Sequence, residues 1–280
     1  MLEDVVGLLR CPHCAAELAR RESAVGCANG HSFDVARQGY ASLLHGDAQT
    51  GTADTREMIE AREAFHHAGH YEAAADLLAT ECAGAVAAVP GGAIVDVGAG
   101  TAYYLARVLN RLPRRVGLAL DLSKHALRRA AKVHPRIGAV ACDVWRALPV
   151  RTGVAAVVMS VFSPRNAAEM RRVLGPGGAL LLLTPTPRHL AELIPALGLL
   201  GVDERKEERL EEQLGPYFEL IRRGEHEWVM ALGRADVEHL VGMGPSARHT
   251  DPARLREGVG RLPEPVTVTA SVAVSVFRGL

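Results

Sequence analysis

Five apolar segments between residues 91 and 187 alternate with stretches of helical pattern, and this alternation constrains the fold more than any other feature. With their flanking turns and helices, the segments are GGAIVDVGAGTAYYLARVL (91–109), RVGLALDLS (115–123), RIGAVACDVWRALP (136–149), VAAVVMSVFSPRN (154–166) and RRVLGPGGALLLLTPTP (171–187). The first three predicted strands end in an acid, at Asp96, Asp121 and Asp143. Strands that alternate with helices and carry polar residues at their carboxyl ends predict an α/β fold with a doubly wound parallel sheet.

A glycine turn follows the first predicted strand. Gly98 and Gly100 allow the backbone to approach a ligand closely at the N-terminus of the next helix. The dinucleotide-binding pattern G-x-G-x-x-G requires a third glycine at the position of Tyr103. The glycine pair alone is therefore weak support for a nucleotide site, and its spacing from the strand-end acids strengthens it.

In this order the motifs resemble those of the class I S-adenosylmethionine-dependent methyltransferases, whose fold is a Rossmann-like doubly wound sheet. Members have acid-x-G-x-G at the first strand, an acid at the end of the second, an Asp after the third and L-x-P-G-G before the fifth. All four features are present here. The cofactor contacts that the resemblance implies are Asp96, Gly98, Gly100 and Thr101 around the methionine and ribose, Asp121 at the ribose hydroxyls, and Asp143 with Val144 at the adenine. Aspartates that only cap helices would explain each acid singly but not the series.

Three of the five cysteines lie in the first thirty residues, in the pattern C-x2-C-x12-C-x3-H formed by Cys11, Cys14, Cys27 and His31. The start, MLEDVVGLLR, has acids where a signal peptide has positive charge, which predicts a cytoplasmic protein in which disulfides rarely persist. The spacing then favours a structural zinc site with four protein ligands. The alternative, a thioredoxin-like C-x-x-C pair, would leave Cys27 and His31 without a role.

The organisation predicted from these motifs is a zinc-binding domain (1–44), a linker with helices (45–90) and a methyltransferase domain (91–280). HGDAQTGTADT (45–55) reads as a flexible linker, and the charge run DERKEERLEEQ (203–213) as a solvated helix. PVTVTASVAVSVF (265–277) alternates apolar and small polar residues, which predicts a closing edge strand. No apolar run approaches the ~20 residues that a membrane helix requires.

A zinc unit before such a domain resembles the bacterial 23S rRNA guanine-N1-methyltransferases, including the branch that gives resistance to tylosin and related macrolides. The motifs that carry this resemblance are CPHC, CANGHSFDVARQGYASLL (27–44), AREAFHHAGHYEAA (61–74), LTPTPRHLAEL (183–193) and MGPSARH (243–249). It implies that Tyr71 and His189 lie against the cofactor. Many relatives have an acid after the second glycine where this chain has Thr101, so that contact differs in detail.

The resemblance also implies where the acceptor base lies, because class I enzymes hold it near the end of the fourth strand. The candidates for that wall are Ser163, Pro164, Arg165 and Asn166. Arg165 or Arg248 is the candidate to stabilise negative charge at guanine O6, and no general base is evident.

The expected RNA partner is a 23S rRNA hairpin. The zinc unit either grips it, through Arg37, Gln38 and Tyr40, or is purely architectural. Residues 101–175 contain fourteen Lys or Arg against three Asp or Glu, so KHALRRAAKVHPR (124–136) is a candidate for phosphate contacts. A small-molecule methyltransferase with a structural zinc and a non-catalytic RNA-binding protein remain as alternatives. The sequence does not fix the oligomeric state, for which a homodimer is one alternative.

Overall fold

The computed structural model describes residues 1–201, 203 and 205–280, and its centre is an eight-stranded sheet. The strands lie in the order β10-β11-β9-β8-β5-β6-β7-β4. Neighbours from β9 to β4 are parallel, whereas β11 pairs antiparallel with both β9 and β10. The strands are β4 (Ala41–Ser42), β5 (Ala93–Val97), β6 (Gly117–Asp121), β7 (Ile137–Ala141), β8 (Ala155–Val161), β9 (Leu174–Pro185), β10 (Phe218–Leu232) and β11 (Val266–Gly279).

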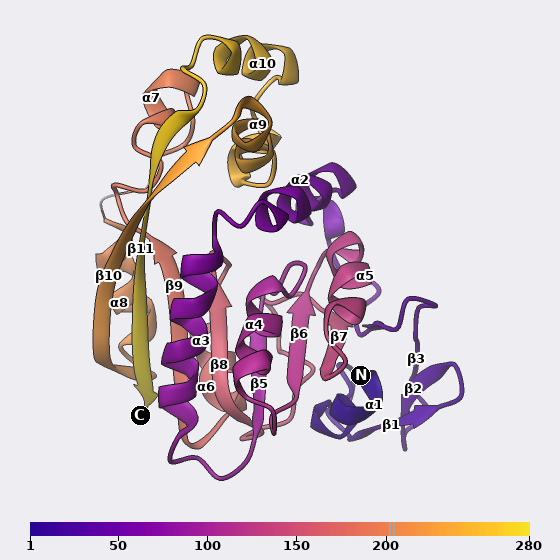
Figure 1. Cartoon of the computed structure of the whole chain (residues 1–280). Helices are drawn as coiled ribbons and strands as arrows, with labels where there is room; N and C mark the ends of the chain where they lie inside the picture. The colour runs from indigo at the N-terminus through magenta and orange to yellow at the C-terminus, as the bar shows by residue number, and fades with distance from the viewer. Residues whose placement is uncertain (202, 204) are drawn as a thin grey trace.

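Helices cover both faces of this sheet (Figure 1). Side chains alternate between the two faces of a strand, so Ile94 of β5 packs with α3, α4 and α5, while Val95 packs with α1, α6 and α8. The helices are α1 (Leu2–Val5), α2 (Arg56–His67), α3 (Glu72–Val86), α4 (Tyr103–Arg111), α5 (Lys124–Val133), α6 (Ala167–Val173), α7 (Leu193–Leu197), α8 (Lys206–Leu214), α9 (Arg234–Gly242) and α10 (Pro252–Gly260). None of the helices in the described part of the chain is long and apolar enough to cross a membrane.

The five predicted parallel strands are confirmed as β5, β6, β7, β8 and β9. They read as nearly continuous apolar runs because both faces of a central parallel strand are buried, as all five residues of β5 and β7 are. The Pro-Gly-Gly turn expected before the fifth strand lies inside the bounds of β9. There the register against β8 shifts between Leu174 and Ala179, so the turn forms a bulge.

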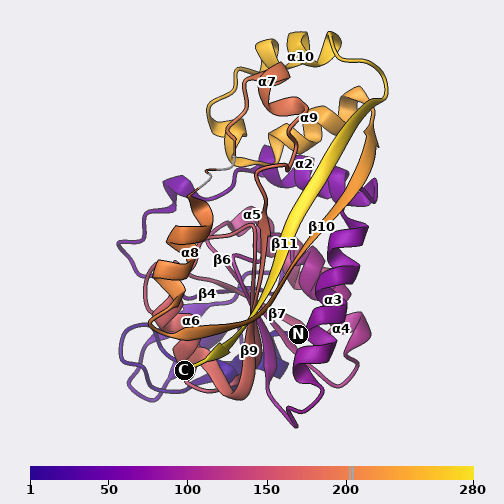
Figure 2. The same cartoon turned by 90° about the vertical axis from the view of Figure 1, so that its left-hand side faces the viewer.

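The prediction that residues 265–277 form an edge strand is wrong, because β11 lies between β9 and β10. Its small polar residues, such as Ser271 and Ser275, are buried rather than solvent-facing. The edge is β10, which was not predicted because charged and apolar residues share its exposed positions without a regular alternation. Figure 2 shows β10 and β11 as one long hairpin that rises from the sheet into a group of helices.

We call these helices the cap. It consists of α7, which follows β9, and of α9, the 3-10 helix η3 (Pro245–Arg248) and α10, which lie between β10 and β11. Its apolar side chains, including Leu193, Leu240 and Val259, belong to the same core as the α3 face of the sheet. The predicted solvated helix at 203–213 is α8, with buried Leu210 and Leu214; residue 204 of that run lies outside the described residues.

The N-terminal unit contains a three-stranded sheet, β1 (Leu18–Arg21), β2 (Ala24–Cys27) and β3 (Ser32–Asp34), beside α1 and the short 3-10 helix η1 (Val6–Leu8). It packs on the second face of the central sheet, where Val25 and Phe33 share a core cluster with Val95. The approach of α1 to β7 is so close that a Cβ at Gly138 would overlap the side chain of Val5. The unit therefore takes the place that a helix would occupy on that face.

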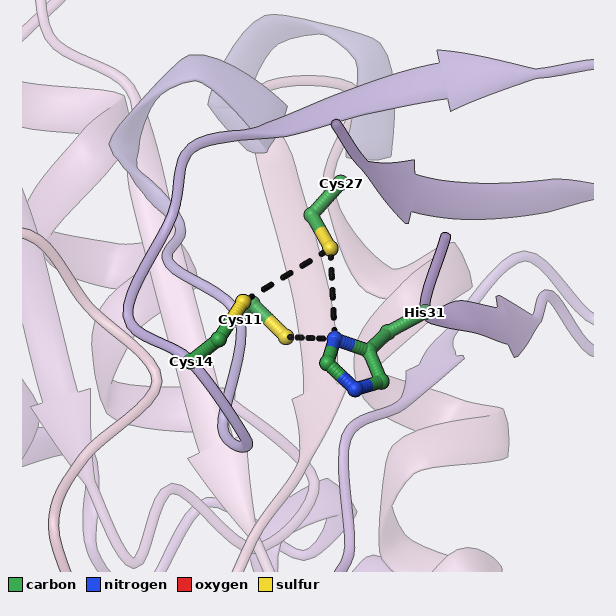
Figure 3. Close-up of side chains that lie close together, drawn as sticks. All are labelled: Cys11, Cys14, Cys27 and His31. Carbon is green, nitrogen blue, oxygen red and sulfur yellow. Dashed lines mark hydrogen bonds between the residues drawn. The ribbon is translucent and has the colours of Figure 1, made fainter. Parts of the chain in front are cut away.

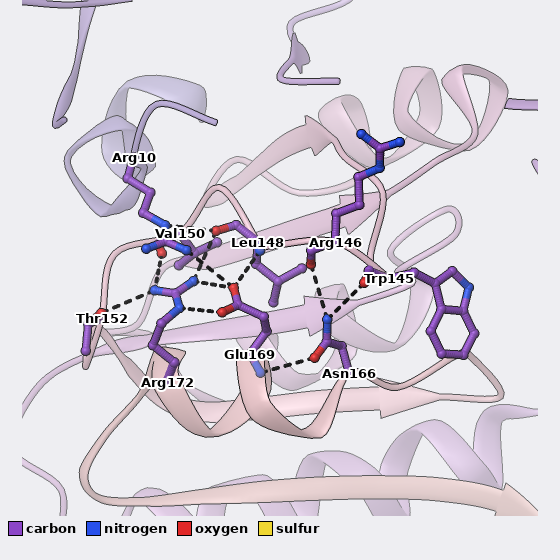
Figure 4. Close-up of polar contacts among 9 residues, drawn as sticks. All are labelled: Arg10, Trp145, Arg146, Leu148, Val150, Thr152, Asn166, Glu169 and Arg172. Atoms are coloured by element: carbon purple, nitrogen blue, oxygen red, sulfur yellow. Dashed lines mark hydrogen bonds and ion pairs between the residues drawn. The ribbon is translucent and has the colours of Figure 1, made fainter. Parts of the chain in front are cut away.

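A polar network ties this unit to α6 (Figure 4). Glu169 accepts a hydrogen bond from the backbone N–H of Leu148 at 2.6 Å and pairs with Arg172 at 2.7 Å and with Arg10 at 3.5 Å. Burial opposes ionisation of Glu169, but the bonds from Arg172 and Leu148 hold its pKa below the ordinary value. Glu169 is therefore a charged link between the N-terminal unit and the central domain.

Candidate zinc centre and cofactor site

The four predicted metal ligands converge on one point (Figure 3). Their donor atoms all lie within 4.8 Å of one another. His31 Nδ1 is 3.5 Å from the Cys11 sulfur and 3.4 Å from the Cys27 sulfur, and the sulfurs of Cys14 and Cys27 are 3.8 Å apart. A zinc ion with bonds of about 2.3 Å to sulfur has tetrahedron edges of ~3.8 Å, so the donor set and its spacing fit a closed structural site.

Three side chains that follow the zinc ligands, Arg37, Gln38 and Tyr40, were expected to face RNA. For Tyr40 this prediction is wrong. Tyr40 is buried and packs in the core on the α3 face of the sheet. The chain turns at Gly39, whose φ of +97° directs the next residue into β4 and the central sheet. Arg37 is exposed and Gln38 is half-buried, so these two remain candidates for an RNA contact.

The strand-end acids meet at the carboxyl edge of the sheet. Asp121 lies at the end of β6, and its carboxylate accepts hydrogen bonds from the backbone N–H groups of Gly100 at 2.7 Å and Ser123 at 2.8 Å. The glycine turn is left-handed at Gly98 and Gly100, with φ of +76° and +55°. A Cβ at Gly98 would meet Ser163 Cβ at 2.5 Å, so only glycine fits there. Asp121 thus fixes the shape of the turn through these two hydrogen bonds.

Three buried polar atoms beside this turn have no hydrogen-bond partner among the described residues. They are Asp96 Oδ1, Tyr104 Oη and His66 Nδ1. The rings of His66 and Tyr104 lie 5.6 Å apart. Burial raises the pKa of the Tyr104 hydroxyl, and the charge of Asp96 is among the smaller contributions to this shift. Buried polar groups are rarely left unpaired, so these atoms fit a polar, partly cationic ligand such as the methionine end of S-adenosylmethionine.

Burial, with a smaller contribution from the charge of Asp121, raises the pKa of Asp96 to about 8. The unfolded chain releases this proton near pH 4, so between pH 4 and about 8 the unliganded folded protein binds more protons than the unfolded chain. This part of the stability is fully present below pH 4 and is lost as the pH rises to about 8.

We expect the unfolding free energy of Asp96→Asn to depend less on pH than that of the wild type between pH 5 and 8, by about 1 kcal/mol per pH unit. Urea unfolding of both proteins without cofactor measures this difference. Parallel pH profiles would show that Asp96 is already ionised in the folded chain.

Tyr71 and His189 are far apart in the sequence but in contact in the structure. The backbone N–H of Ser271 donates to His189 Nδ1 at 3.1 Å, which makes Nε2 the protonated nitrogen of a neutral ring. His189 Nε2 then donates to the Tyr71 oxygen at 3.1 Å. The hydroxyl hydrogen of Tyr71 is therefore directed away from His189 and is available to a further acceptor.

Two of the four predicted acceptor-wall residues after β8, Ser163 and Asn166, make side-chain hydrogen bonds that stabilise the fold. Ser163 donates to the carbonyl of Val97 at 2.6 Å and bonds Ser160, which joins the ends of β5 and β8. Asn166 caps α6 by accepting from Glu169 N–H at 3.3 Å, and its amide donates to the carbonyls of Trp145 and Arg146 (Figure 4). Both side chains thus have structural contacts, and their place in the acceptor wall stays a prediction.

Arg165 and Pro164 are the other two residues of the expected acceptor wall. Pro164 is exposed. The Nε of Arg165 is buried without a hydrogen-bond partner among the described residues, and burial lowers the pKa of this guanidinium. A half-buried cation of this kind fits an anionic or carbonyl group of a ligand.

Phe162, the residue directly after β8, is not among the site residues predicted from the sequence. The residue is 39% exposed, and its ring lies 6.0 Å from Tyr71 and 5.9 Å from His189, measured between ring centroids. Its backbone is left-handed, with φ of +52°. A large aromatic residue between a strand end and S-P-R was the available signal in the sequence.

Arg248 contacts the linker that precedes α2. Its guanidinium donates to the carbonyls of Thr52 at 2.5 Å and Ala53 at 3.1 Å, and it lies 3.5 Å from the carboxylate of Asp54. Asp54 also pairs with Arg62 at 2.7 Å, whose Nη1 would lie 3.0 Å from a Cβ at Gly100. Arg248 therefore positions the linker beside the glycine turn, a role different from the one expected for it at guanine O6.

Two segments match family models. Residues 9–48 match the zinc-ribbon model described as "RlmA, N-terminal", and residues 94–178 match the model described as a methyltransferase domain. The chain is 46% identical to the 23S rRNA (guanine(748)-N(1))-methyltransferase of Streptomyces fradiae, with 100% of both chains covered. It is 49% identical to a protein of Micromonospora griseorubida that is named as a 23S rRNA (guanine-N(1)-)-methyltransferase, with 99% of both chains covered. The chain belongs to the 23S rRNA (guanine-N1)-methyltransferase family.

In this 23S rRNA (guanine-N1)-methyltransferase family member, the zinc-ribbon match contains all four metal ligands, and the methyltransferase match runs from β5 into β9. Among solved structures, the crystal structure of MccD protein aligns with a TM-score of 0.50 at 12% identity, over 73% of this chain and 96% of that one. This similarity shows the fold alone. The cap and the β10–β11 hairpin lie outside both family-model matches.

Proposed function

We propose that this methyltransferase transfers the methyl group of S-adenosylmethionine to N1 of a guanine in a hairpin loop of 23S rRNA. The observation that carries the proposal is the end-to-end identity with the Streptomyces fradiae enzyme, which is named for guanine 748. Guanine 748 is accordingly the position we expect. An rRNA substrate places the protein in the cytoplasm, and methylation at this position would protect the ribosome from macrolides.

The cofactor site follows from the carboxyl edge of the sheet. Asp121 would hold the ribose hydroxyls, and Asp143 with the buried Val144 would contact the adenine. The orphaned carboxylate oxygen of Asp96 would hold the methionine end, beside the turn from Gly98 to Thr101. Tyr71, oriented by His189, supplies a hydroxyl at the same edge. When bound, the cofactor supplies an activated methyl group on a positive sulfur.

The chain's own task is to position the acceptor. In the proposed reaction, N1 of guanine would form a bond to the methyl carbon as the carbon–sulfur bond of the cofactor breaks, and the N1 proton would leave to solvent. The N1 edge normally lies in a base pair, so the guanine has to be unpaired or turned out of its stack. Arg165 would stabilise the negative charge that develops at O6 as the proton leaves, since its buried Nε has no partner among the described residues.

A basic surface supports an RNA substrate. A cavity of about 180 Å³ between α2 and α5 is lined by Arg56, Ile59, His125, Arg128 and Arg129. Arg56 and Arg129 pair with Glu60 and Glu63, whereas no ion pair is found for Arg128 within the described ranges. A backbone phosphate fits such a cavity, and contacts of this kind would make activity fall with salt.

The test is incubation with labelled S-adenosylmethionine and unmodified 23S rRNA, followed by primer extension. N1-methylguanine blocks the pairing edge, so one new reverse-transcriptase stop at a hairpin-loop guanine is expected. Cofactor binding without label in the RNA would favour a small-molecule methyltransferase. No cofactor binding at all would favour a non-catalytic RNA-binding protein.

Arg165→Ala is expected to lower kcat on the rRNA hairpin roughly 100-fold, because the transition state loses a charged hydrogen-bond donor. The Kd for S-adenosylmethionine is expected to stay within about twofold. Single-turnover kinetics and calorimetry measure the two quantities. Arg261→Ala, at an exposed ion pair on α10, is the matched control. Wild-type turnover in Arg165→Ala would remove this residue from the acceptor site.

A further inference from the structure

Phe162 holds a backbone conformation that costs free energy. Its φ of +52° lies in the left-handed region, which a bulky residue rarely adopts. Glycine would adopt it without strain, and the same chain uses glycine at Gly98 and Gly100 beside it. Strain of this kind persists where the surrounding structure enforces it, and it is concentrated at functional sites.

The surrounding bonds show how the strain is enforced. The N–H of Phe162 donates to the carbonyl of Leu183 on β9 at 3.0 Å. The next residue, Ser163, is fixed by its bonds to Val97 and Ser160 and touches the glycine turn. The chain therefore bends at Phe162, directly after β8, and these bonds hold the bend in place.

The ring of Phe162 packs against other aromatic side chains, and the residue is partly exposed to solvent. Tyr71 and His189, both buried, lie behind it at interplanar angles of 28° and 30°, and Tyr104 lies edge-on at 6.5 Å. The exposed side of Phe162 is thus an aromatic face backed by the Tyr71–His189 pair. Trp145 is more exposed, at 64%, but no ring contact backs it in the described part of the chain.

We propose that the target guanine stacks on Phe162 when it is presented for methylation. This inference rests on the proposed function and names the residue that touches the acceptor. A base turned out of its stack loses the stacking contacts with its neighbouring bases. An aromatic side chain can replace these contacts by stacking on the base. Phe162 lies between the candidate cofactor contacts Tyr71 and His189 and solvent, and it precedes Arg165 by three residues. The candidate stacking residue and the candidate guanidinium for O6 thus lie in the same short segment after β8.

The test compares Phe162→Ala, Phe162→Leu and Phe162→Tyr on a 23S rRNA hairpin transcript, with kcat, KM and the Kd of S-adenosylmethionine measured separately. Stacking is worth roughly a 5- to 150-fold change per base, so Phe162→Ala should lose about 10- to 100-fold in kcat/KM for RNA. Phe162→Leu, which keeps apolar bulk without a π-face, should lose nearly as much, and Phe162→Tyr should recover most of the activity. The Kd of the cofactor should not change.

Tyr217→Ala is the matched control, because Tyr217 is an aromatic residue of similar exposure, 38%, beside the start of β10. It should retain wild-type kcat/KM. Thermal melting identifies any variant that fails to fold, and Phe162→Gly, which releases the backbone strain, supplies a second variant in that case. If Phe162→Leu or Phe162→Ala retains wild-type kcat/KM, or if cofactor affinity falls in parallel with activity, the stacking role is wrong. If the wild type methylates no RNA, the proposed function itself fails.

Discussion

Replacing Cys27 with alanine is expected to abolish zinc binding and to unfold the N-terminal unit. The Cys27 sulfur lies next to two other donors, Cys14 and His31, so its loss opens the closed site. Structural zinc contributes ~10 kcal/mol or more of apparent binding free energy in small zinc units. Because Val25 and Phe33 of this unit share a core with β5, we expect the unfolding free energy of the whole chain to fall by about 5 kcal/mol.

Zinc content by mass spectrometry and urea unfolding measure the two effects. Cys82→Ala is the matched control, since Cys82 is a buried free cysteine on α3 outside the cluster. It should keep one zinc per chain and lose about 1–2 kcal/mol at most. If Cys27→Ala still binds one zinc per chain, the ligand set is different. If it loses zinc at unchanged stability, packing alone holds the unit.

Asp121→Ala is expected to weaken S-adenosylmethionine binding about 100-fold or more. Two bonds to ribose hydroxyls from a half-buried carboxylate are together worth ~3 kcal/mol, which corresponds to that factor. The same substitution frees the N–H groups of Gly100 and Ser123 and loosens the glycine turn. Asp121→Asn keeps the size and one acceptor oxygen, so its loss should be smaller, about tenfold.

Isothermal titration calorimetry measures both affinities. Asp76→Ala, which removes an exposed partner of Arg107, is the control and should bind the cofactor as the wild type does. A Kd for Asp121→Ala within twofold of wild type would show that Asp121 only shapes the turn.

The elements that could be predicted are those whose structure is determined by residues adjacent in the sequence. The central strands are readable because burial on both faces demands apolar runs, and the zinc centre because ligand spacing follows from tetrahedral geometry. The glycine turn, and the acids at the end of β6 and just after β7, could be predicted as well, because each is recognised from its place directly after an apolar strand.

The rest depends on contacts between distant segments. The strand β10 carries charges on its exposed side, so its sequence shows no strand pattern until β11 is placed beside it. Tyr40 looks like a surface residue until β4 joins β7 and carries it into the core. The structural role of Asn166 as the N-cap of α6 becomes visible only once α6 is placed after β8. The strain at Phe162 is a property of its backbone that residue type does not reveal.

Most of the cap, namely α9, η3 and α10, is inserted between two strands that remain paired beneath it. Leu232, the last residue of β10, is the register partner of Val266, the first of β11. The inserted segment therefore leaves and returns at adjacent points, and a change in its length does not shift the pairing below. Insertions at such points are well tolerated. In evolutionary terms, the hairpin lets the inserted segment change in length without a change in strand register, whereas η3 within it stays tied through Arg248 to the linker beside the glycine turn.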